Sequence, residues 1–339
     1  MPNQTKIGVM LSGGIDSALL LYLIRREYPT TDVVAYHTDW GSSYTEGIEV
    51  EGARSSAEFC ESPLKIIDGG LKAQIPYVQD AISETLTMNY SVTLFYLAFD
   101  QIKKESTDVV LLGDGLDSFF GGGRFHKIYY MRPKFGIIPF IQRLIGFRPY
   151  SLATKILGRE FAWFVCMISD QPSELVNDSE FTFTKLYNRV KGSSLWDLVE
   201  NWNVDNGITD AAVTARAAWA HELDALFPFM TQDIVNLSSQ FSPKVNTNKA
   251  IIRKYMMDLG FPKGIVDTGI DWDKKGWGAT ASPYFEEPFL SRIIPEQADM
   301  QYWFTKRGCD LIRNIKKNQS PNAFIMMLFL KILELRNLM

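Results

Sequence analysis

The stretch that decides the fold is Leu11-Ser12-Gly13-Gly14-Ile15-Asp16-Ser17, a serine- and glycine-rich turn near the start of a 339-residue chain. The apolar run 6–11 before it predicts a buried strand, and the apolar run 18–24 after it predicts a buried helix. Glycines let the backbone approach a ligand closely, and unpaired N–H groups at a helix start attract anions. The sequence therefore predicts an anion-binding turn between a strand and a helix.

Asp16 is the unexpected member of this turn, because a carboxylate repels a bound phosphate. Its place is explained if Asp16 binds a divalent metal ion that also bridges to phosphate oxygens. Ser12 and Ser17 add hydroxyl donors to the same turn. The alternative interpretation is a glycine turn that joins a strand to a helix and binds no ligand.

The pattern Ser-Gly-Gly-x-Asp-Ser differs from two common phosphate-binding motifs. It lacks the Gly-Lys-Ser/Thr end of a Walker A loop, and Gly13-Gly14 does not fit the GxGxxG dinucleotide fingerprint. It resembles the pyrophosphate loop, or PP-loop, of the ATP pyrophosphatases. The resemblance implies that the chain cleaves ATP between its α- and β-phosphates and releases AMP and pyrophosphate.

Further apolar segments predict more strands of the same sheet. These segments are 32–36, 63–67 and 107–112, with helices expected at 44–59 and 74–103. Strands joined through helices run parallel, with right-handed crossovers. We therefore predict an α/β fold with a parallel sheet of about five strands and helices on both faces.

The chain length predicts more than one small core. We expect residues 1–125 to form a nucleotide-binding α/β region. Residues 126–339 are expected to be mostly helical and to complete the active site. Within them, 210–241 is expected to be one long helical stretch. The apolar segment 135–147 is expected to belong to the helical part, as an apolar hairpin of helices, with a membrane-surface or partner-binding face as the alternative.

A second glycine-rich segment, 113–123, follows the predicted strand 107–112 and reads Gly-Asp-Gly-Leu-Asp-Ser-Phe-Phe-Gly-Gly-Gly. Ligands of open parallel sheets bind at the carboxyl ends of the strands. Asp114 and Asp117 can therefore face the same ligand as Asp16. Two such carboxylates can share a magnesium ion with ATP phosphates. The alternative is a glycine-rich loop whose aspartates are solvated.

This second segment resembles the Gly-Glu-Gly-x-Asp-Glu-x-Phe-Gly-Gly segment of asparagine synthetases and β-lactam synthetases. The resemblance implies that Asp16 and Asp117 bind Mg²⁺ and that Leu112 and Gly113 contact the nucleotide. Asp114 stands where asparagine synthetases have Glu and β-lactam synthetases have Tyr. Those side chains are linked to handling protons on the attacking amine, so the resemblance implies a catalytic role for Asp114, on a side chain one methylene shorter than Glu.

Two later segments continue the resemblance in the order of the family. Residues 226–235 resemble Arg-x-Pro-Phe-Leu-Asp-x-x-(Leu/Ile)-Val, with Leu226 in place of the arginine and Thr231 in place of the aspartate. These departures suggest a changed substrate side of the site. Residues 249–256 match the Lys-x-x-(Leu/Ile)-Arg helix that follows.

The loop 271–278 resembles the Lys-x-Gly-Phe-Gly loop that carries the catalytic lysine of the family. By spacing this lysine is Lys274, with Lys275 as the second choice, and it would neutralise charge on pyrophosphate. Trp40 or the backbone of Thr38 could face adenine, because both leave a predicted strand end. The nucleotide is thus expected to contact Leu11, Ser12, Gly13, Gly14, Asp16, Ser17, Thr38, Leu112 and Gly113.

The resemblance implies an AMP-forming ligase that activates a carboxylate with ATP and transfers it to ammonia or an amine. The resemblance covers residues 6–280 and does not include a glutaminase domain. We therefore expect nitrogen from ammonia, from a substrate amine or from a separate glutaminase subunit. The alternatives are a PP-loop enzyme that modifies a nucleobase or tRNA, and a nucleotide-binding subunit without turnover.

Composition favours a cytoplasmic protein with small-molecule substrates. The net charge of −4 argues against non-specific nucleic-acid binding. Cys60, Cys166 and Cys309 lack CxxC spacing and suit buried thiols in a reducing compartment. The N-terminal residues contain no apolar signal segment, and no apolar run reaches the roughly 18 residues that a membrane-spanning helix needs.

Overall fold

The protein is described here as a computed structural model that covers residues 6–40, 48–87, 92–122, 195–241, 243–268, 289–293 and 306–314, together with 327, 328, 330–332 and 334. Three features that the sequence singled out lie outside these residues: the lysines Lys274 and Lys275, the apolar segment 135–147, and Cys166.

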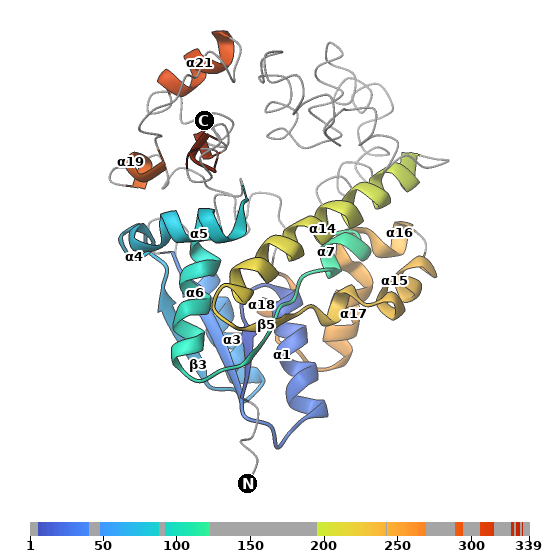
Figure 1. Ribbon diagram of the computed structural model, residues 1–339. Coiled ribbons are helices and arrows are strands. Elements are labelled where there is room, and N and C mark those ends of the chain that lie inside the picture. The colour runs from blue at the N-terminus through green and yellow to red at the C-terminus, as the bar shows by residue number, and fades with distance from the viewer. Residues whose placement is uncertain are drawn as a thin grey trace.

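The described residues contain a parallel sheet of five strands in the order β3-β2-β1-β4-β5 (Figure 1). The strands are β1 (Ile7–Met10), β2 (Val33–Asp39), β3 (Leu64–Asp68), β4 (Val109–Leu111) and β5 (Asp224–Leu226). β1 is central and pairs with β2 on one side and β4 on the other. The α/β fold class predicted from the sequence is confirmed.

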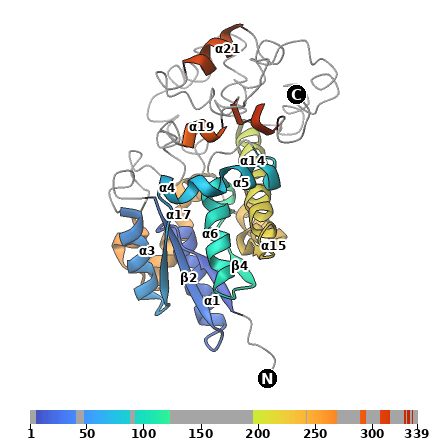
Figure 2. The same ribbon diagram turned by 60° about the vertical axis from the view of Figure 1, so that its left-hand side comes forward.

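Helices cover both faces of this sheet. Around the sheet lie α1 (Ile15–Glu27), α3 (Ile48–Phe59), α4 (Leu71–Gln74), α5 (Val78–Thr85), α6 (Val92–Lys104), α7 (Leu116–Phe119) and α14 (Leu195–Trp219). Further along the chain are α15 (Gln232–Ser239), α16 (Pro243–Asn246), α17 (Ala250–Asp258), α18 (Lys263–Val266), α19 (Phe289–Ile293) and α21 (Lys306–Arg313). Within the described ranges, short 3-10 turns lie at Ile75–Tyr77, Pro228–Met230 and Thr247–Lys249. Figure 2 shows α3 and α6 on opposite sides of β2.

The helix predicted across 210–241 is wrong in its middle. α14 ends at Trp219, Glu222 takes a left-handed conformation (φ 55°), and β5 follows at Asp224–Leu226. β5 pairs with β4, and its first N–H donates to the carbonyl of Asp108. The predicted helix 74–103 also divides, because Leu86 is left-handed (φ 53°) at the end of α5.

β5 belongs to the region that the sequence assigned to helices, so residues on both sides of position 125 build the sheet. The division of the chain at residue 125 stays a prediction.

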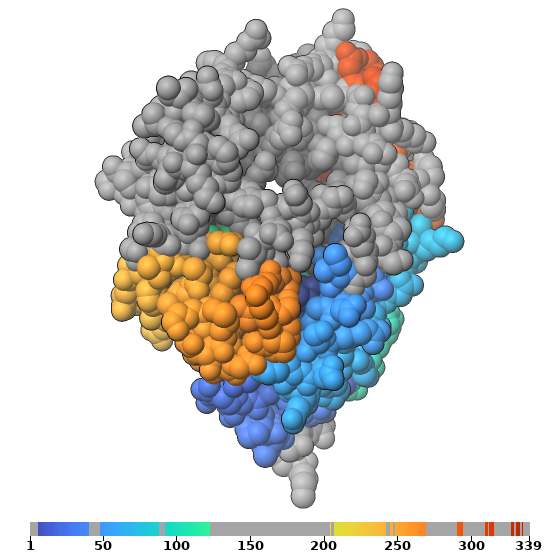
Figure 3. Space-filling view, turned by 180° about the vertical axis from the view of Figure 1, so that it is seen from behind, coloured from blue at the N-terminus to red at the C-terminus, as the bar shows by residue number. Residues whose placement is uncertain are grey.

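Two apolar layers hold the helices on the sheet. One layer joins α1 and α3 to α17 and α18, through residues such as Leu20, Ala53, Ile252 and Met256. The other joins β2 and β4 to α6 and α14, through residues such as Tyr36, Phe99, Val110 and Ala218. Seen from behind, α17 and α18 (orange) lie against the N-terminal segments (blue) (Figure 3).

Burial of apolar surface supplies the main stabilisation of such layers. The chain after residue 243 therefore completes the core of the nucleotide-binding part.

Cys60 is a buried free thiol and Cys309 is also buried, as predicted from the sequence. None of the helices in the described part of the chain is both long and apolar enough to cross a membrane.

The first layer depends on Met256, which is fully buried, while its neighbour Met257 is 55% exposed. We expect Met256→Ala to lower the free energy of unfolding by about 2–5 kcal/mol, because it leaves a cavity under α17. The matched control Met257→Ala should change it by less than about 0.5 kcal/mol. Urea denaturation of both variants measures this difference. Equal effects would show that α17 does not pack on the sheet as described.

Candidate active site

The turn between β1 and α1 is held by its two serines. The Ser12 and Ser17 hydroxyls lie 3.1 Å apart, the Ser12 N–H donates to the Ser17 hydroxyl at 3.1 Å, and the Gly14 N–H donates to Ser12 Oγ at 3.3 Å. Gly14 is the N-cap of α1, and no side chain caps this helix start. The serines therefore fix the loop, and the start of α1 is not blocked by a capping side chain.

Gly13 cannot be replaced without distortion. Its φ is +82°, a conformation that favours glycine, and a Cβ there would collide with the carbonyl oxygen of Glu49 on α3. A Cβ on Gly52 would likewise lie 2.7 Å from the Gly13 carbonyl oxygen. α3 therefore packs on the loop backbone itself and sets its position.

The second glycine-rich segment lies beside the first. A Cβ on Gly113 would lie 2.9 Å from the backbone nitrogen of Ser17, at the start of α1. The Leu112 N–H donates to the Leu226 carbonyl at 3.0 Å, which ties the end of β4 to the end of β5. The carboxyl ends of β1 and β4 therefore meet, as the sequence predicted for neighbouring parallel strands.

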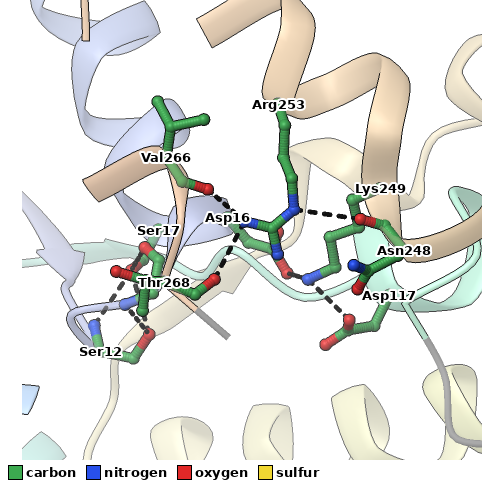
Figure 4. Close-up of polar contacts among 10 residues, drawn as sticks. Ser12, Asp16, Ser17, Asp117, Asn248, Lys249, Arg253, Val266 and Thr268 are labelled. Atoms are coloured by element: carbon green, nitrogen blue, oxygen red, sulfur yellow. Dashed lines mark hydrogen bonds and ion pairs between the residues drawn. The ribbon is translucent and has the colours of Figure 1, made fainter. Parts of the chain in front are cut away.

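Lys249 connects the two loops. Its ammonium nitrogen lies 2.6 Å from Asp16 Oδ2 and 2.6 Å from Asp117 Oδ1 (Figure 4). The side chains of Lys249 and Asp16 are 10% and 19% exposed, so this pair is largely withdrawn from water, whereas the Asp117 side chain is 63% exposed. Asp16, Asp117 and Lys249 are named here the charge cluster. The structure brings together the two aspartates predicted to bind metal, and adds a lysine to which the sequence assigned no contact.

The backbone conformation around Lys249 directs its side chain toward Asp16 and Asp117. Asn248 and Lys249 are both left-handed (φ 58° and 56°), just before α17 begins. Their N–H groups donate to the carbonyls of Gly121 and Phe120, each at 2.9 Å. Consecutive left-handed residues other than glycine are strained and persist only where their surroundings impose them. A Cβ on Gly122 would collide with Asp117 Oδ1 and Lys249 Cε, so glycine gives the lysine its path.

Arg253 supports this backbone from the next turn of α17. Its Nε donates to the Asn248 carbonyl at 3.1 Å, and its Nη1 donates to the carbonyls of Val266 and Thr268, the latter at 3.0 Å (Figure 4). The guanidinium thus joins the left-handed segment to the end of α18. The Lys-x-x-x-Arg spacing in the sequence thus has a structural explanation: Lys249 contacts the two aspartates, and Arg253 holds the backbone next to Lys249.

The charges of the cluster perturb one another. Burial raises the pKa of the Asp16 carboxyl to about 6, and the nearby Lys249 ammonium opposes that rise. Burial by itself would lower the pKa of Lys249, but the charges of Asp117 and Asp16 outweigh it and raise the pKa. Lys249 is therefore a permanent cation at neutral pH, and it is the counter-charge of Asp16.

Asp16 and Asp117 fit a magnesium ion. Asp16 Oδ1 is buried and has no hydrogen-bond partner in the described structure. Carboxylate oxygens are the donors that Mg²⁺ prefers, and it is held by one or two of them together with substrate phosphates and water. No group of three or more metal-ligating side chains occurs among the described residues. A metal at Asp16 and Asp117 would therefore need oxygen atoms from a ligand.

Asp114 lies near a second carboxylate that the sequence did not indicate. Burial and, second to it, the charge of Asp210 on α14 together raise the pKa of Asp114 to about 6. Asp210 remains accessible to water, but the surrounding protein withdraws enough solvent to raise its pKa to about 6 as well. The sequence predicted only a helix for the segment that contains Asp210, and no motif marked Asp210 as a functional residue.

The expected adenine side lies at the end of β2. Thr38 belongs to this strand and is 3% exposed, with a buried hydroxyl that has no partner in the described structure. Beside it, burial and then the charge of Asp39 raise the pKa of Glu49 to about 7. The buried His37 ring lies 2.7 Å from the Leu11 carbonyl, which fits the hydrogen-bonded role the sequence favoured. Lys274, the predicted catalytic lysine, lies outside the described residues.

Together these features define an α/β protein in which the predicted phosphate-binding turn, the second glycine segment and the charge cluster share one edge of a parallel sheet. The family model described as asparagine synthase matches residues 1–269. The chain belongs to the asparagine synthase family, whose members are ATP-using enzymes of the PP-loop type.

The chain was also compared with curated protein sequences and with solved structures. A comparison with curated protein sequences gave no match. Among solved structures, the chain is similar to the U34-tRNA thiolase NcsA from Methanococcus maripaludis with its [4Fe-4S] cluster, at 13% identity and a TM-score of 0.33, over 98% of this chain and 72% of that one.

Gly122 offers a test of the cluster geometry. We expect Gly122→Ala to weaken binding of the ATP analogue AMPCPP, which cannot be cleaved between its α- and β-phosphates, by about tenfold or more. It should also lower the free energy of unfolding by about 1–3 kcal/mol, because the methyl group displaces Asp117 and Lys249. Titration calorimetry and urea denaturation measure the two effects.

The control for this substitution is Gly264→Ala, in α18, where a Cβ would meet no atom within 4 Å. It should leave both quantities near those of the parent protein. Unchanged AMPCPP binding by Gly122→Ala would contradict the assignment of the charge cluster to the nucleotide site.

Proposed function

We propose that this protein is an AMP-forming amide ligase. It activates a small-molecule carboxylate with ATP and transfers the acyl group to ammonia or an amine. The observation that carries the proposal is the convergence of Asp16, Asp117 and Lys249 from three separate segments onto the edge where the predicted phosphate loop lies. Membership of the asparagine synthase family supports the same chemistry.

In the first step a carboxylate oxygen attacks the α-phosphorus of ATP, and the bond to the β-phosphate oxygen breaks. Loop N–H groups between Ser12 and Ser17 and the ammonium of Lys249 would stabilise the charge on the phosphate groups. Bound Mg²⁺, held by Asp16 and Asp117, would supply Lewis-acid neutralisation of phosphate charge. The products of this step are an acyl-adenylate and pyrophosphate, and Lys274 is proposed to neutralise the latter.

In the second step the amine nitrogen attacks the acyl carbon, the bond to AMP breaks, and the nitrogen gives up a proton. Asp114 is proposed to accept that proton, because a carboxylate with a pKa of about 6 is ionised at neutral pH and still basic enough for the transfer. The charge of Asp210 supports this by favouring the protonated form of Asp114 after the transfer.

The partners follow from this chemistry. They are a carboxylate substrate and ammonia or an amine, with a separate glutaminase subunit as a proposed nitrogen source. Leu226, at the end of β5, is 49% exposed, so an apolar surface stands where asparagine synthetases have arginine. This favours an acyl substrate other than aspartate, because aspartate would present an additional anionic group to a site without that guanidinium.

Product analysis tests the proposal directly. ATP labelled on its α-phosphate is incubated with Mg²⁺, ammonia and a panel of carboxylic and amino acids. We expect labelled AMP, with equimolar pyrophosphate and amide, to form only with the correct carboxylate. Labelled ADP would contradict the proposal. AMP that forms only when tRNA or a nucleobase replaces the carboxylate would support base modification instead, and ATP binding without cleavage of any kind would support the non-catalytic subunit.

Asp114 gives the second step a defined pH dependence. A proton acceptor must be ionised, so the rate of amide formation should fall as pH drops through about 6 and level off above it. Asp114→Asn should lower that rate by about 10²–10⁴-fold and remove this pH step, while adenylation continues. Rapid-quench kinetics on the acyl-adenylate measures both.

The control for Asp114 is Asp108→Asn, because Asp108 lies on the surface and pairs with Lys103 at 3.5 Å. It should behave as the parent protein does. An Asp114→Asn variant with the parent rate and pH profile would exclude Asp114 as the proton acceptor.

A further inference from the structure

We propose that Lys249 is a resident counter-ion that competes with the divalent metal for Asp16 and Asp117. The metal then enters the site effectively only together with the triphosphate, which gives the displaced ammonium a new anionic partner. This inference rests on the proposed use of metal-bound ATP, and it concerns how the site distinguishes that complex from the free metal ion.

Lys249 occupies the position that a bound metal ion would take. The Lys249 ammonium contacts one oxygen of each carboxylate at 2.6 Å, which are the same two side chains that would bind the metal (Figure 4). Like charges repel strongly where little water screens them, and both Lys249 and Asp16 are largely buried. A divalent cation and this ammonium therefore cannot both bridge Asp16 and Asp117.

The surroundings of Lys249 limit where its displaced ammonium can move. The backbone of Lys249 is fixed by hydrogen bonds to Phe120 and Gly121, and Arg253 holds the preceding carbonyl. Only the side chain can move, and its path runs close to Gly122. A metal ion that arrives alone would leave a buried ammonium without an anionic partner, which is strongly unfavourable. A triphosphate on the neighbouring loop removes that penalty.

One oxygen of the Asp16 carboxylate has no partner while Lys249 occupies the site. Asp16 Oδ2 accepts from Lys249, whereas the buried Asp16 Oδ1 has no partner in the part of the chain that the structure describes. The resident ammonium thus satisfies only half of this carboxylate. A metal ion that displaces the ammonium, and brings oxygen ligands of its own, would find an unsatisfied acceptor there.

The test is a titration with Mn²⁺ as the metal probe, followed by electron paramagnetic resonance of the free ion, without nucleotide or substrate. We expect the parent protein to bind Mn²⁺ weakly and Lys249→Met to bind it at least tenfold more tightly. Lys249→Arg, which keeps the positive charge, should remain as weak as the parent. Lys254→Met removes an exposed lysine of the same helix, which pairs with Asp258 at 2.9 Å, and should also match the parent.

An affinity of Lys249→Met within about twofold of the parent would overturn the proposal. If Lys249→Met does not fold without metal, Lys249→Gln is the second variant, because it keeps a donor to the carboxylates without the charge. If neither folds alone, Mn²⁺ should restore folding by replacing the missing counter-charge, and a failure to do so would also overturn the proposal.

A parallel titration with AMPCPP separates this inference from the proposed function. If neither the parent protein nor any of the variants binds Mn²⁺ in the presence of AMPCPP, the proposed metal-dependent use of ATP fails. If the parent and all variants bind Mn²⁺ in the presence of AMPCPP, but Lys249→Met binds Mn²⁺ no more tightly than the parent in its absence, only the competition by Lys249 is overturned.

Discussion

The structure depends on the bridge from the Lys249 ammonium to Asp16 and Asp117, in which the Lys249–Asp16 pair is largely buried and the Asp117 side chain is exposed. Breaking such a buried ion pair by removing one partner typically costs about 3–5 kcal/mol, because a charge is left without compensation. The bridge is also the point where the loop after β1, the loop after β4 and the segment before α17 meet. Stability and chemistry therefore rest on the same three side chains.

Close backbone packing makes this meeting geometrically possible. Gly13 lies against α3, Gly113 lies against the start of α1, and Gly122 leaves the path for the lysine. Each of these positions excludes a Cβ for a different reason: a neighbouring carbonyl, a helix start and a charged side chain. The glycines that the sequence placed near a ligand thus also bring protein segments together, and that packing forms the edge where we propose that phosphates bind.

The sequence predicted the sheet well where its signals are local. The strands around Val9, Val34, Ile67 and Val110 follow apolar runs, and the loop at 11–17 follows from its glycines. β5 was missed because three residues between helices carry little periodicity, and its pairing with β4 decides its structure. The contact of Lys249 was missed because it joins residues 233 positions apart through two left-handed residues, which no local pattern encodes.

The central claim is that Asp16 and Lys249 act as one coupled unit. A double-mutant cycle with Asp16→Asn, Lys249→Met and the double variant, measured as free energies of unfolding in urea without metal, tests it most directly. The account predicts a coupling energy of about 1 kcal/mol or more, as expected for charged residues in contact. Additivity of the two single substitutions to within about 0.5 kcal/mol would contradict it.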